Sequence, residues 1–253
     1  MNLTILKTRS DLENWRKQSK NQPIHFVPTM GCLHQGHKAL IKAAKFSSKE
    51  QPARVLVSIF VNPLQFAKGE DFSTYPRNLE QDCKTAMSAG ASAIWAPEFE
   101  TLFPKGKEHY FTIKAPSSLK ECLCGAHRKN HFDGVATIVL RLLNYVRPKQ
   151  LYLGEKDWQQ LVILRQLVKE LGLEVEVQSI ATVRDQDGLA FSSRNKYLTP
   201  EERAKALTLP KLLLQESIQF QSNKKINLKK LCSMLEKNDL NVEYLEIVDS
   251  KSL

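Results

Sequence analysis

The sequence contains no run of about 18 apolar residues, so it predicts no membrane-spanning helix. Its first residues lack the basic-then-apolar layout and the small-residue cleavage site of a secretory signal, which predicts a cytoplasmic protein. Cysteines are few, odd in number and scattered: Cys32, Cys83, Cys122, Cys124 and Cys232. Such a set favours reduced thiols over a disulfide framework. No second pair with zinc spacing accompanies Cys122 and Cys124, so we interpret that pair as incidental.

Acidic residues are outnumbered, with 27 Asp and Glu against 37 Lys and Arg, and the formal net charge is +10. Such a charge suits binding of nucleic acid, of anionic lipid or of a polyanionic small molecule such as ATP. An RNA-binding module would gather arginines and exposed aromatics on one face, whereas here the basic residues are spread widely. The modest cluster at Lys224, Lys225, Lys229 and Lys230 surrounds a helix predicted to begin at Asn227, and we interpret it as a solvated face. We therefore expect no nucleic-acid partner.

Short apolar runs alternate with helical patterns along residues 1–181. The runs at 25–30, 54–62, 91–97, 150–154 and 174–181 predict strands, and several are apolar throughout, as in parallel strands covered on both faces. Helices are predicted at 36–49, 76–89, 134–146 and 157–171, the last closed by Gly172. A strand and a helix opened by a capping box from Ser10 to Glu13 precede them. This alternation predicts an α/β fold, in which a Rossmann-like, doubly wound parallel sheet forms a nucleotide-binding catalytic domain at 1–181.

A different pattern follows at 182–253, where we expect a smaller α+β domain with a polar loop around 191–195 at the junction. A helix with strong start signals comes next, because Thr199 can cap it, Pro200 suits its first position and Glu202 completes a capping box. Two further helices and a final strand at 241–248 are predicted. The two parts together would place the loop beside the carboxyl edge of the sheet.

The first candidate site follows the strand at 25–30. A turn at Gly31 and a helix beginning near Gly36 place His34 and His37 three residues apart on one helical turn, so both can face the same ligand. At this edge of an α/β sheet, backbone N–H groups and a helix N-terminus attract phosphate. Each histidine can donate to phosphate oxygens and stabilise departing pyrophosphate. Zinc or a plain surface pair is the alternative, and zinc lacks a carboxylate or third ligand at a suitable local spacing.

Further polar residues follow later strands. Asn62-Pro63 breaks the second strand, and the amide of Gln65 can donate and accept toward a small ligand with carboxylate and hydroxyl groups. Arg128 and His131 can donate to a carboxylate or a phosphate. Alone, Gln65 would be interpreted as an ordinary turn residue.

Gly154 to Asp157 stand where a strand passes into a helix. Lys156 is a mobile point charge suited to phosphates, and Asp157 can accept from ribose hydroxyls. One of Gln159 and Gln160, in the first turn of that helix, is expected to face the pocket. Such a charged turn is more often a solvated loop, but its place at the carboxyl edge of the sheet favours a site.

The loop at 191–195 adds two hydroxyls and an arginine. Ser192, Ser193 and Arg194 can fold over a triphosphate and stabilise its transition-state charge. Without the other motifs this loop would be interpreted as a solvent-facing linker. Asp82, on the helix predicted at 76–89, we interpret as an ordinary surface acid rather than a site residue.

In this order the motifs carry more information than they do singly. The set PTMG-x-LH-x-GH, FVNP-x-QF, YPR at 75–77, GEKD-x-QQL and DGL-x-x-SSRN-x-YL closely resembles the pantothenate synthetase family, and the resemblance spans about residues 24–203. Its H-x-G-H element is similar to that of nucleotidyltransferases and class I aminoacyl-tRNA synthetases. The resemblance implies ATP-dependent condensation of (R)-pantoate with β-alanine to pantothenate, through a pantoyl-adenylate, with release of AMP and pyrophosphate. ATP, Mg²⁺ and a homodimer are implied with it.

The resemblance also implies roles for single residues. His34, His37, Lys156 and Arg194 would be catalytic, with His37 as a proton donor that acts mainly by stabilising phosphate. Pantoate and β-alanine would contact Gln65, Gln160, Arg128 and His131. ATP would contact a longer set of residues, which in chain order are Met30, Gly31, Cys32, Leu33, His34, Gln35, Gly36, His37, Gly154, Glu155, Lys156, Asp157, Val183, Phe191, Ser192, Ser193 and Arg194. No ligand for the metal is identified.

Three departures from the family pattern are visible. Phe191 stands where Met or Leu is usual, and Lys129-Asn130 replaces the more usual Pro-Gly. The chain ends soon after Asp249, which predicts an abbreviated small domain. The nearest alternative is another adenylyl-transfer enzyme of the same superfamily, which would share the H-x-G-H element but not Gln65 and the helix that carries Gln160.

Overall fold

The computed structural model describes residues 3–18, 22–47, 52–223 and 225–253. A six-stranded sheet in the order β1-β4-β3-β2-β5-β6 forms its centre, and every neighbouring pair is parallel. The strands are β1 (Thr4–Leu6), β2 (Ile24–Thr29), β3 (Arg54–Ile59), β4 (Ala93–Trp95), β5 (Gln150–Gly154) and β6 (Glu176–Ile180). Five of them correspond to the five apolar runs, and β1 is the strand predicted before the first helix. The predicted parallel sheet is therefore confirmed.

The order in which the chain adds strands to the sheet reverses at β2. From β2 the chain adds β3 and β4 on one side, and it later adds β5 and β6 on the other side. In a doubly wound sheet, ligands bind beyond the carboxyl ends of the strands at the point where this order reverses. In this sheet that point lies between the ends of β2 and β5.

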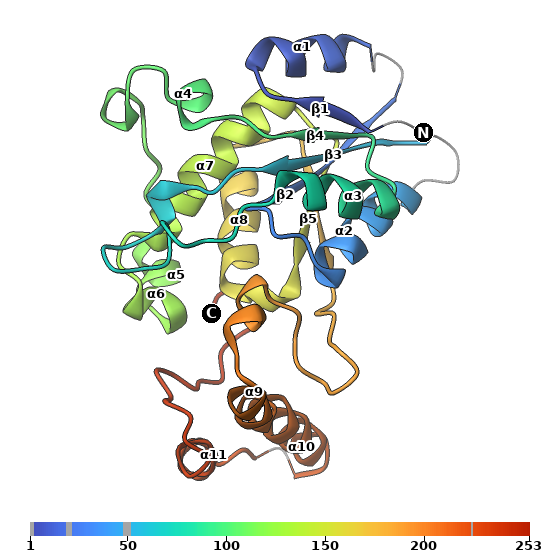
Figure 1. The fold of residues 1–253 in the computed structure, drawn as a ribbon. Helices are drawn as coiled ribbons and strands as arrows, with labels where there is room; N and C mark the ends of the chain where they lie inside the picture. Colours follow the sequence, from blue (N-terminus) through green and yellow to red (C-terminus); the bar gives the residue numbers. More distant parts are fainter. Residues whose placement is uncertain (1–2, 19–21, 48–51, 224) are drawn as a thin grey trace.

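Helices cover both faces of the sheet (Figure 1). On one face pack α1 (Arg9–Lys17), α7 (His131–Val146) and α8 (Trp158–Glu170), and on the other pack α2 (Gln35–Phe46) and α3 (Leu79–Ala89). Successive strand residues point to opposite faces: Phe26 joins the cluster under α7, and Val27 joins the cluster under α2. Both side chains are fully buried, which explains why these strands read as continuous apolar runs.

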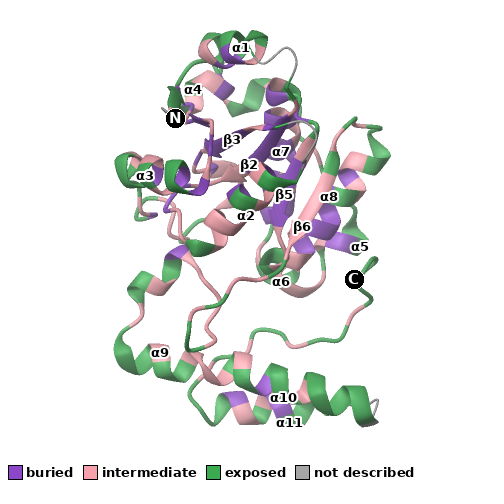
Figure 2. Ribbon diagram, turned by 90° about the vertical axis from the view of Figure 1, so that its right-hand side faces the viewer, coloured by how far each residue is buried: buried purple, intermediate pink, exposed green. Residues whose placement is uncertain are grey.

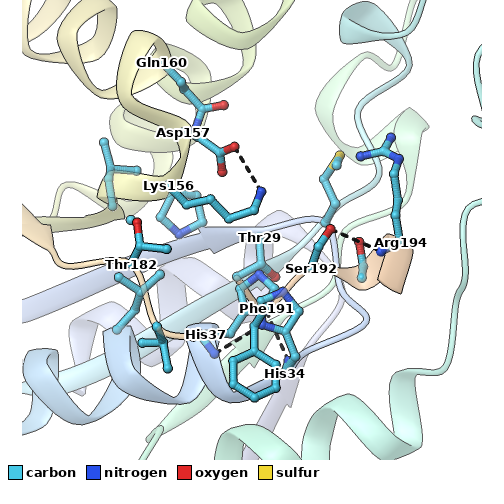
Figure 3. A pocket seen from close by; sticks show the side chains of 18 of the residues that line it. Thr29, His34, His37, Lys156, Asp157, Gln160, Thr182, Phe191, Ser192 and Arg194 are labelled. Atoms are coloured by element: carbon cyan, nitrogen blue, oxygen red, sulfur yellow. Dashed lines mark hydrogen bonds and ion pairs between the residues drawn. The ribbon is translucent and has the colours of Figure 1, made fainter. Parts of the chain in front are cut away.

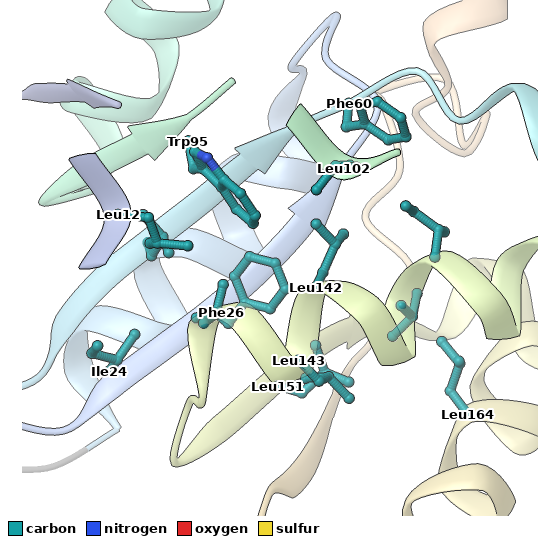
Figure 4. Close-up of a cluster of buried hydrophobic side chains, with 14 of the residues drawn as sticks. Leu12, Ile24, Phe26, Phe60, Trp95, Leu102, Leu142, Leu143, Leu151 and Leu164 are labelled. Atoms are coloured by element: carbon teal, nitrogen blue, oxygen red, sulfur yellow. The ribbon is translucent and has the colours of Figure 1, made fainter. Parts of the chain in front are cut away.

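The α7 face holds the larger core. Figure 4 shows Phe26 and Trp95 from the sheet beside Leu142 from α7, and Leu12 from α1 closes the same cluster. Because all the helices over the sheet pack on a rigid parallel scaffold, the loops at its carboxyl edge start from fixed positions. That rigidity positions the site.

The remaining helices are short or lie after the sheet. Those between the strands are α4 (Phe99–Leu102), α5 (Ser117–Lys120), α6 (Leu123–His127) and the 3-10 turns η1 (Pro63–Gln65), η2 (Lys107–His109) and η3 (Glu155–Asp157). After β6 come η4 (Ser193–Tyr197), α9 (Pro200–Ala206), α10 (Thr208–Asn223) and α11 (Leu228–Glu236). None of the described helices is long and apolar enough to cross a membrane. Residues 48 and 49 of one predicted helix, and Lys224 of the basic cluster, lie outside the described residues.

Helix starts were predicted with mixed success. The capping box at Thr199 and Glu202 forms as expected, with Pro200 in the first turn. The first helix begins earlier than predicted, because Thr8 caps it. The Thr8 hydroxyl accepts from the Asp11 N–H, and the Asp11 carboxylate accepts from the Thr8 N–H. Glu13, the predicted partner of Ser10, instead pairs with Arg9 at 2.8 Å.

The expected strand at 241–248 does not form, so the part after β6 is helical rather than α+β. Within residues 182–223 and 225–253 the structure has no strand, only an isolated bridge between Arg184 and Ala190. Val242 and Leu245 pack against a small helical cluster around Leu212 instead of pairing with a sheet edge. Figures 1 and 2 show α9, α10 and α11 grouped together beside the sheet-containing body, with the final segment returning to that body.

Candidate active site

A single cavity lies at the switch point, and the predicted catalytic side chains line it together. His34 and His37 come from the turn after β2, Lys156 from the turn after β5, and Arg194 from η4. Figure 3 shows Lys156 opposite the two histidines, with Ser192 and Arg194 on a third side. Parallel strands place the loops that follow them at one edge of the sheet, so residues over 150 positions apart in the chain share one site.

The turn between β2 and α2 requires glycine at Gly31. Its φ of +84° lies in the left-handed region, and a Cβ there would approach Asp82 Oδ2 to 2.9 Å. Asp82 holds the turn from α3, since its Oδ2 accepts from the Cys32 N–H at 3.0 Å and its Oδ1 accepts from the Leu33 N–H at 2.7 Å. The carboxylate thus fixes the backbone directly before His34.

The interpretation of Asp82 as a surface acid is wrong. Its side chain is 2% exposed, inside the protein beside the turn. Burial raises the pKa of Asp82 above its ordinary value, although the two N–H groups oppose the rise. A buried carboxylate with two backbone donors is a positioning residue for the turn that carries the histidines.

The two histidines cap α2 reciprocally. His34 is the N-cap, and its Nδ1 accepts from the Gly36 N–H at 3.2 Å. His37 Nδ1 accepts in turn from the His34 N–H at 3.2 Å, and the two ring centroids lie 4.1 Å apart. A Cβ on Gly36 would lie 3.0 Å from the His34 ring, which accounts for the glycine between them.

These hydrogen bonds fix the tautomer of each imidazole. A ring nitrogen that accepts carries no proton, so neutral His34 and His37 both bear theirs on Nε2. Burial, and then Lys156, lowers the pKa of His34 to about 4. Burial, the His34 ring and Lys156 lower the pKa of His37 to about 3. At neutral pH the pair therefore presents two uncharged Nε2–H donors.

Five backbone N–H groups of this turn, which the sequence suggests could bind phosphate, already donate within the protein. Each of the following amides donates to an acceptor of the protein itself: Gly31, Cys32, Leu33, His34 and Gly36. The acceptors are the Thr29 hydroxyl, Asp82 and the two imidazoles. The backbone thus orients the histidine rings, and the rings are left to meet the ligand.

The turn after β5 supplies a cation and an amide. Lys156 Nζ lies 3.4 Å from Asp157 Oδ1, and both side chains are substantially exposed, so the pair is weak and Lys156 can turn to another anion. Gln160 lines the cavity. Gln159 points away from it, because its Nε2 donates to the Leu119 and Cys122 carbonyls, each at 2.9 Å.

Gln65 is held at the cavity wall by Asn62, which is 1% exposed. Asn62 Nδ2 donates to Gln65 Oε1 and to the Gly134 carbonyl, both at 3.1 Å, and Gln65 Nε2 donates to Met30 Sδ at 3.1 Å. A thioether is a weak acceptor, so the Gln65 amide can exchange it for a better one on a ligand. Asn62 is thus a positioning residue and the N-cap of η1, whereas β3 itself ends at Ile59, before the predicted break at Asn62-Pro63.

His131 and Arg128 form one chain of hydrogen bonds. His131 Nδ1 donates to the Gln65 carbonyl at 2.8 Å, so its Nε2 is the acceptor for Arg128 Nη1 at 3.1 Å. Arg128 gives its remaining fork to Glu70, through Nε at 3.0 Å and Nη2 at 2.7 Å. Burial, followed by the nearby Arg128 charge, lowers the pKa of His131, so the ring is neutral. Both residues line the cavity with their donors engaged.

The 191–195 loop reaches the cavity with both serines and with Phe191. Phe191 stacks on His34, with ring centroids 6.1 Å apart, and its N–H donates to the Val183 carbonyl at 3.1 Å. The Ser193 hydroxyl lies 3.2 Å from the buried Tyr75 hydroxyl. Arg194 donates to Asp71 in a bidentate pair, through Nε at 3.0 Å and Nη2 at 2.7 Å.

Some residues in the predicted ATP set do not line the cavity: Gly31, Cys32, Leu33, Gln35 and Glu155. The first three shape the turn, and Glu155 accepts from the Ser179 hydroxyl of β6 at 3.0 Å. Cavity-lining residues that the sequence interpretation missed include Thr29, Tyr75 and Thr182. Tyr75 belongs to the YPR motif, so its place in the ordered set was a signal that could have found it.

The site is suited to a polyanion beside a small polar acid. Its lining combines neutral imidazole donors, Lys156 and hydroxyls with the amides of Gln65 and Gln160. Among the described residues no group of three or more His, Cys, Asp and Glu side chains could hold a metal ion. Asp157 is the one carboxylate among the described residues that line the cavity.

Comparisons with known proteins agree with this architecture. A family model described as Pantoate-beta-alanine ligase matches residues 4–253. The bifunctional pantoate ligase/cytidylate kinase of Prochlorococcus marinus is 59% identical over 254 residues, which cover 100% of this chain and 49% of that protein. This chain thus spans about half the length of the curated relatives it matches.

Solved structures extend the likeness to three dimensions. Pantothenate synthetase from Thermus thermophilus matches with a TM-score of 0.88 and 38% identity, over 99% of this chain and 89% of that chain. The pantoate-beta-alanine ligase from Francisella tularensis, complexed with beta-gamma ATP and β-alanine, matches with a TM-score of 0.86 and 34% identity, over 98% and 90% of the two chains. Family model, sequence identity and fold all lead to one conclusion: this chain belongs to the pantoate-beta-alanine ligase family.

Proposed function

We propose that this chain uses ATP to condense (R)-pantoate with β-alanine, forming pantothenate, AMP and pyrophosphate through a pantoyl-adenylate. The observation that carries the proposal is the shared cavity of His34, His37, Lys156 and Arg194, with Gln65 and Gln160 on its wall. Cationic and neutral donors suit the phosphates, and the two amides suit the carboxylate and hydroxyls of a small acid. The names of the family and of its solved members support the same reaction.

ATP would lie across the switch point, with its phosphates between α2 and Lys156. Ser192 and Ser193 add hydroxyl donors from the loop that faces them. Asp157 would accept from ribose hydroxyls, and the adenine would lie beside Phe191 and Val183, which line the same cavity and are joined by a backbone hydrogen bond. The ligand named for the Francisella tularensis relative, beta-gamma ATP with β-alanine, supports this assignment of the cavity.

In the first step a pantoate carboxylate oxygen attacks the α-phosphorus, and the bond from that phosphorus to the bridging oxygen of pyrophosphate breaks. Negative charge grows on the departing pyrophosphate. The neutral Nε2–H groups of His34 and His37, together with Lys156, stabilise that charge without transferring a proton. Gln65 and Gln160 hold pantoate so that its carboxylate points in line, and positioning supplies most of the rate enhancement.

In the second step the neutral amine of β-alanine attacks the acyl carbon of the adenylate. The carbon–oxygen bond to AMP breaks, an amide forms, and the amine loses one proton to solvent. Gln65, held by Asn62 and next to the His131 chain, is placed to hold both organic substrates in turn. Because the adenylate would be hydrolysed by water, enclosure of the cavity favours the amide product.

Mg²⁺ is compatible with this donor set. It is held in nucleotide sites by one or two carboxylates and by substrate phosphates. In this site the phosphates would supply most of the ligands, and Asp157, the one carboxylate on the described cavity wall, would serve the ion only in place of its contact with the ribose. When bound, the ion would neutralise charge on the phosphates.

A direct assay tests the proposal. With ATP and Mg²⁺, formation of AMP, pyrophosphate and pantothenate should require both pantoate and β-alanine, while pyrophosphate exchange into ATP should require pantoate alone. AMP release independent of pantoate would overturn the assignment. Activity with a nucleotide or alcohol acceptor instead would favour the other adenylyl-transfer enzymes of the superfamily. Replacing Gln65 with Ala should raise the KM for pantoate in the first case and change nothing in the second.

From the family resemblance we also propose that the chain acts as a homodimer in the cytoplasm. The formula mass of one chain is 28.9 kDa. Light scattering of the purified chain should give twice that mass, and a mass equal to one chain would contradict the dimer.

A further inference from the structure

Two adjacent carboxylates, Glu70 and Asp71, each occupy the fork of an arginine at the active site. Glu70 holds Arg128 and Asp71 holds Arg194, and each pair has two N–H···O contacts between 2.7 and 3.0 Å. Both acids belong to the segment 66–77, which connects η1 to α3. One segment therefore supplies the acceptors for both arginines that the sequence analysis expected to contact ligands.

The two ion pairs separate the active-site cavity from a neighbouring groove. Arg128 and Arg194 line the cavity, and the same two arginines line the groove together with Glu70 and Asp71. In Figure 3 the Arg194 side chain extends away from His34 and His37. As the structure stands, Arg194 is directed to Asp71 rather than to the place where phosphates would lie.

The pairs differ in how easily they can exchange partners. Arg128 also donates to His131, and both members of its pair are only about a quarter exposed, 28% and 24%. Arg194 is 47% exposed, so its pair with Asp71 is more accessible to solvent and to competing anions. Arg194 lowers the pKa of Asp71, which is therefore ionised at neutral pH. A triphosphate offers more charge and more acceptor oxygens to the same fork than one carboxylate does.

The backbone of the 191–195 loop would keep its place at the cavity if the Asp71–Arg194 pair separated. Ser193 is tied to Tyr75 at 3.2 Å, and Tyr197 donates to the Thr74 carbonyl at 3.3 Å. Both contacts join η4 to the segment 66–77 independently of Asp71. The Arg194 side chain can therefore rotate while its backbone stays at the cavity.

We propose that Asp71 is a positioning residue that holds Arg194 in the nucleotide-free site and yields it to the β- and γ-phosphates of ATP. We call the Asp71–Arg194 pair the latch. The inference rests on the proposed function and names the contact by which the nucleotide is recognised. Glu70 and Arg128 form the fixed part of the same wall. After the first step, Asp71 can take Arg194 back from pyrophosphate, which helps that product to leave.

Binding measurements on Asp71→Asn test the latch. Loss of the competing carboxylate should lower the Kd of ATP roughly two- to five-fold, the equivalent of one exposed ion pair. The Kd of AMP, which lacks the β- and γ-phosphates, should stay unchanged. The matched control is Asp187→Asn, which removes a carboxylate from Arg203 at 2.7 Å outside the cavity and should alter neither constant.

A double-mutant cycle separates the latch from a purely structural role. In an Arg194→Ala background, Asp71→Asn should have no further effect on the Kd of ATP. Weaker ATP binding by Asp71→Asn alone would overturn the latch, because Asp71 would then aim Arg194 at the phosphates rather than compete with them. An equal change for AMP and ATP, or no change, would overturn it as well. Failure of the unmodified chain to bind ATP would overturn the proposed function and the latch together.

Discussion

The main-chain N–H of His34 donates to Nδ1 of His37 at 3.2 Å, and this contact leaves the Nε2 edge of the His37 ring to meet the ligand. It serves the helix, as half of a capping box, and it also fixes the proton on Nε2. His37, expected to act mainly by stabilising phosphate, is thus a neutral hydrogen-bond donor whose orientation the backbone sets. The capping role of Nδ1 and the donor role of Nε2 can be tested separately by the choice of the residue that replaces His37.

Replacing His37 with Asn should remove chemistry and keep structure. Asn Oδ1 can take the place of Nδ1 and accept from the His34 N–H, but nothing replaces the Nε2–H donor. We expect kcat to fall about 10²- to 10³-fold, as for loss of one preorganised donor to developing charge. The free energy of unfolding should stay within about 0.5 kcal/mol of the unmodified value, since the cap is retained. Steady-state kinetics and urea unfolding measure the two quantities.

His37→Ala is the matched comparison, because it loses the cap as well. Its rate should match that of His37→Asn, and its stability should be about 1 kcal/mol lower. If His37→Asn turned over at the normal rate, the donor role of Nε2 would be wrong.

Stability should fall as the solution is acidified below pH 6.5. His34 and His37 have folded-state pKa values of about 4 and about 3, below the ordinary 6.5. Between pH 6.5 and these values the unfolded chain binds more protons than the folded chain. The free energy of unfolding therefore increases with pH in this range and decreases when the solution is acidified. Each histidine can contribute a slope of up to about 1.4 kcal/mol per pH unit.

Urea unfolding of the unmodified chain and of His37→Asn at pH 7.5, 5.5 and 4.5 isolates the contribution of His37. The variant should lose less stability between pH 7.5 and 4.5 than the unmodified chain. Asp82, whose pKa is raised by burial, acts in the opposite direction in both proteins and cancels in the difference. Parallel curves would show that His37 is protonated in the folded protein at its ordinary pKa.

Asp82→Asn should damage both stability and catalysis. The amide keeps one oxygen acceptor but turns a donor toward one of the N–H groups of Cys32 and Leu33. A buried N–H without an acceptor costs about 1–3 kcal/mol, and the displaced turn moves His34 with it. We expect a lower unfolding free energy and a lower kcat. The control Glu80→Gln, on the exposed face of the same helix, should change neither.

Much of the fold follows from local signals. The strands around Phe26 and Leu56 are apolar throughout because helices cover both faces, and that pattern is visible in the chain itself. Because parallel strands end at one edge, the motifs behind them were predicted to converge, and the cavity confirms this for His34, His37, Lys156 and Arg194. The capping signals at Thr199 are equally local.

The wrong predictions concern residues whose burial or pairing depends on contacts with distant parts of the chain. Asp82 stands in the first turn of a helix, where an acid is usual, and only the packing of α3 against a turn 50 residues earlier buries it. The segment 241–248 has β-forming residues but pairs with neither edge strand of the sheet, and Val242 and Leu245 pack on helices instead. The engagement of Arg194 by Asp71 joins residues 123 positions apart, beyond any local pattern.

Gly134 offers a test of how the organic-substrate side is held. It lies inside α7, where replacing glycine with alanine normally stabilises a helix by about 0.5–1 kcal/mol. At this position an added Cβ would overlap the Leu64 carbonyl group and lie 2.8 Å from the Gln65 backbone nitrogen. The backbone of η1 must then move away from α7, which breaks the bridge from Asn62 to the Gly134 carbonyl. Gly134→Ala should therefore lower stability by about 1–3 kcal/mol, as overpacking does.

The same change should raise the KM for pantoate while leaving the Kd of ATP unchanged, because Gln65 moves and the histidines do not. Gly172→Ala is the control: its φ of +59° is unfavourable for alanine, yet no atom would lie within 4 Å of the new Cβ. It should cost about 1–2 kcal/mol in stability with both constants unchanged. A Gly134→Ala chain that is more stable than the original, with an unaltered KM for pantoate, would show that η1 can shift without moving Gln65, and that the close contact with α7 does not position the substrate.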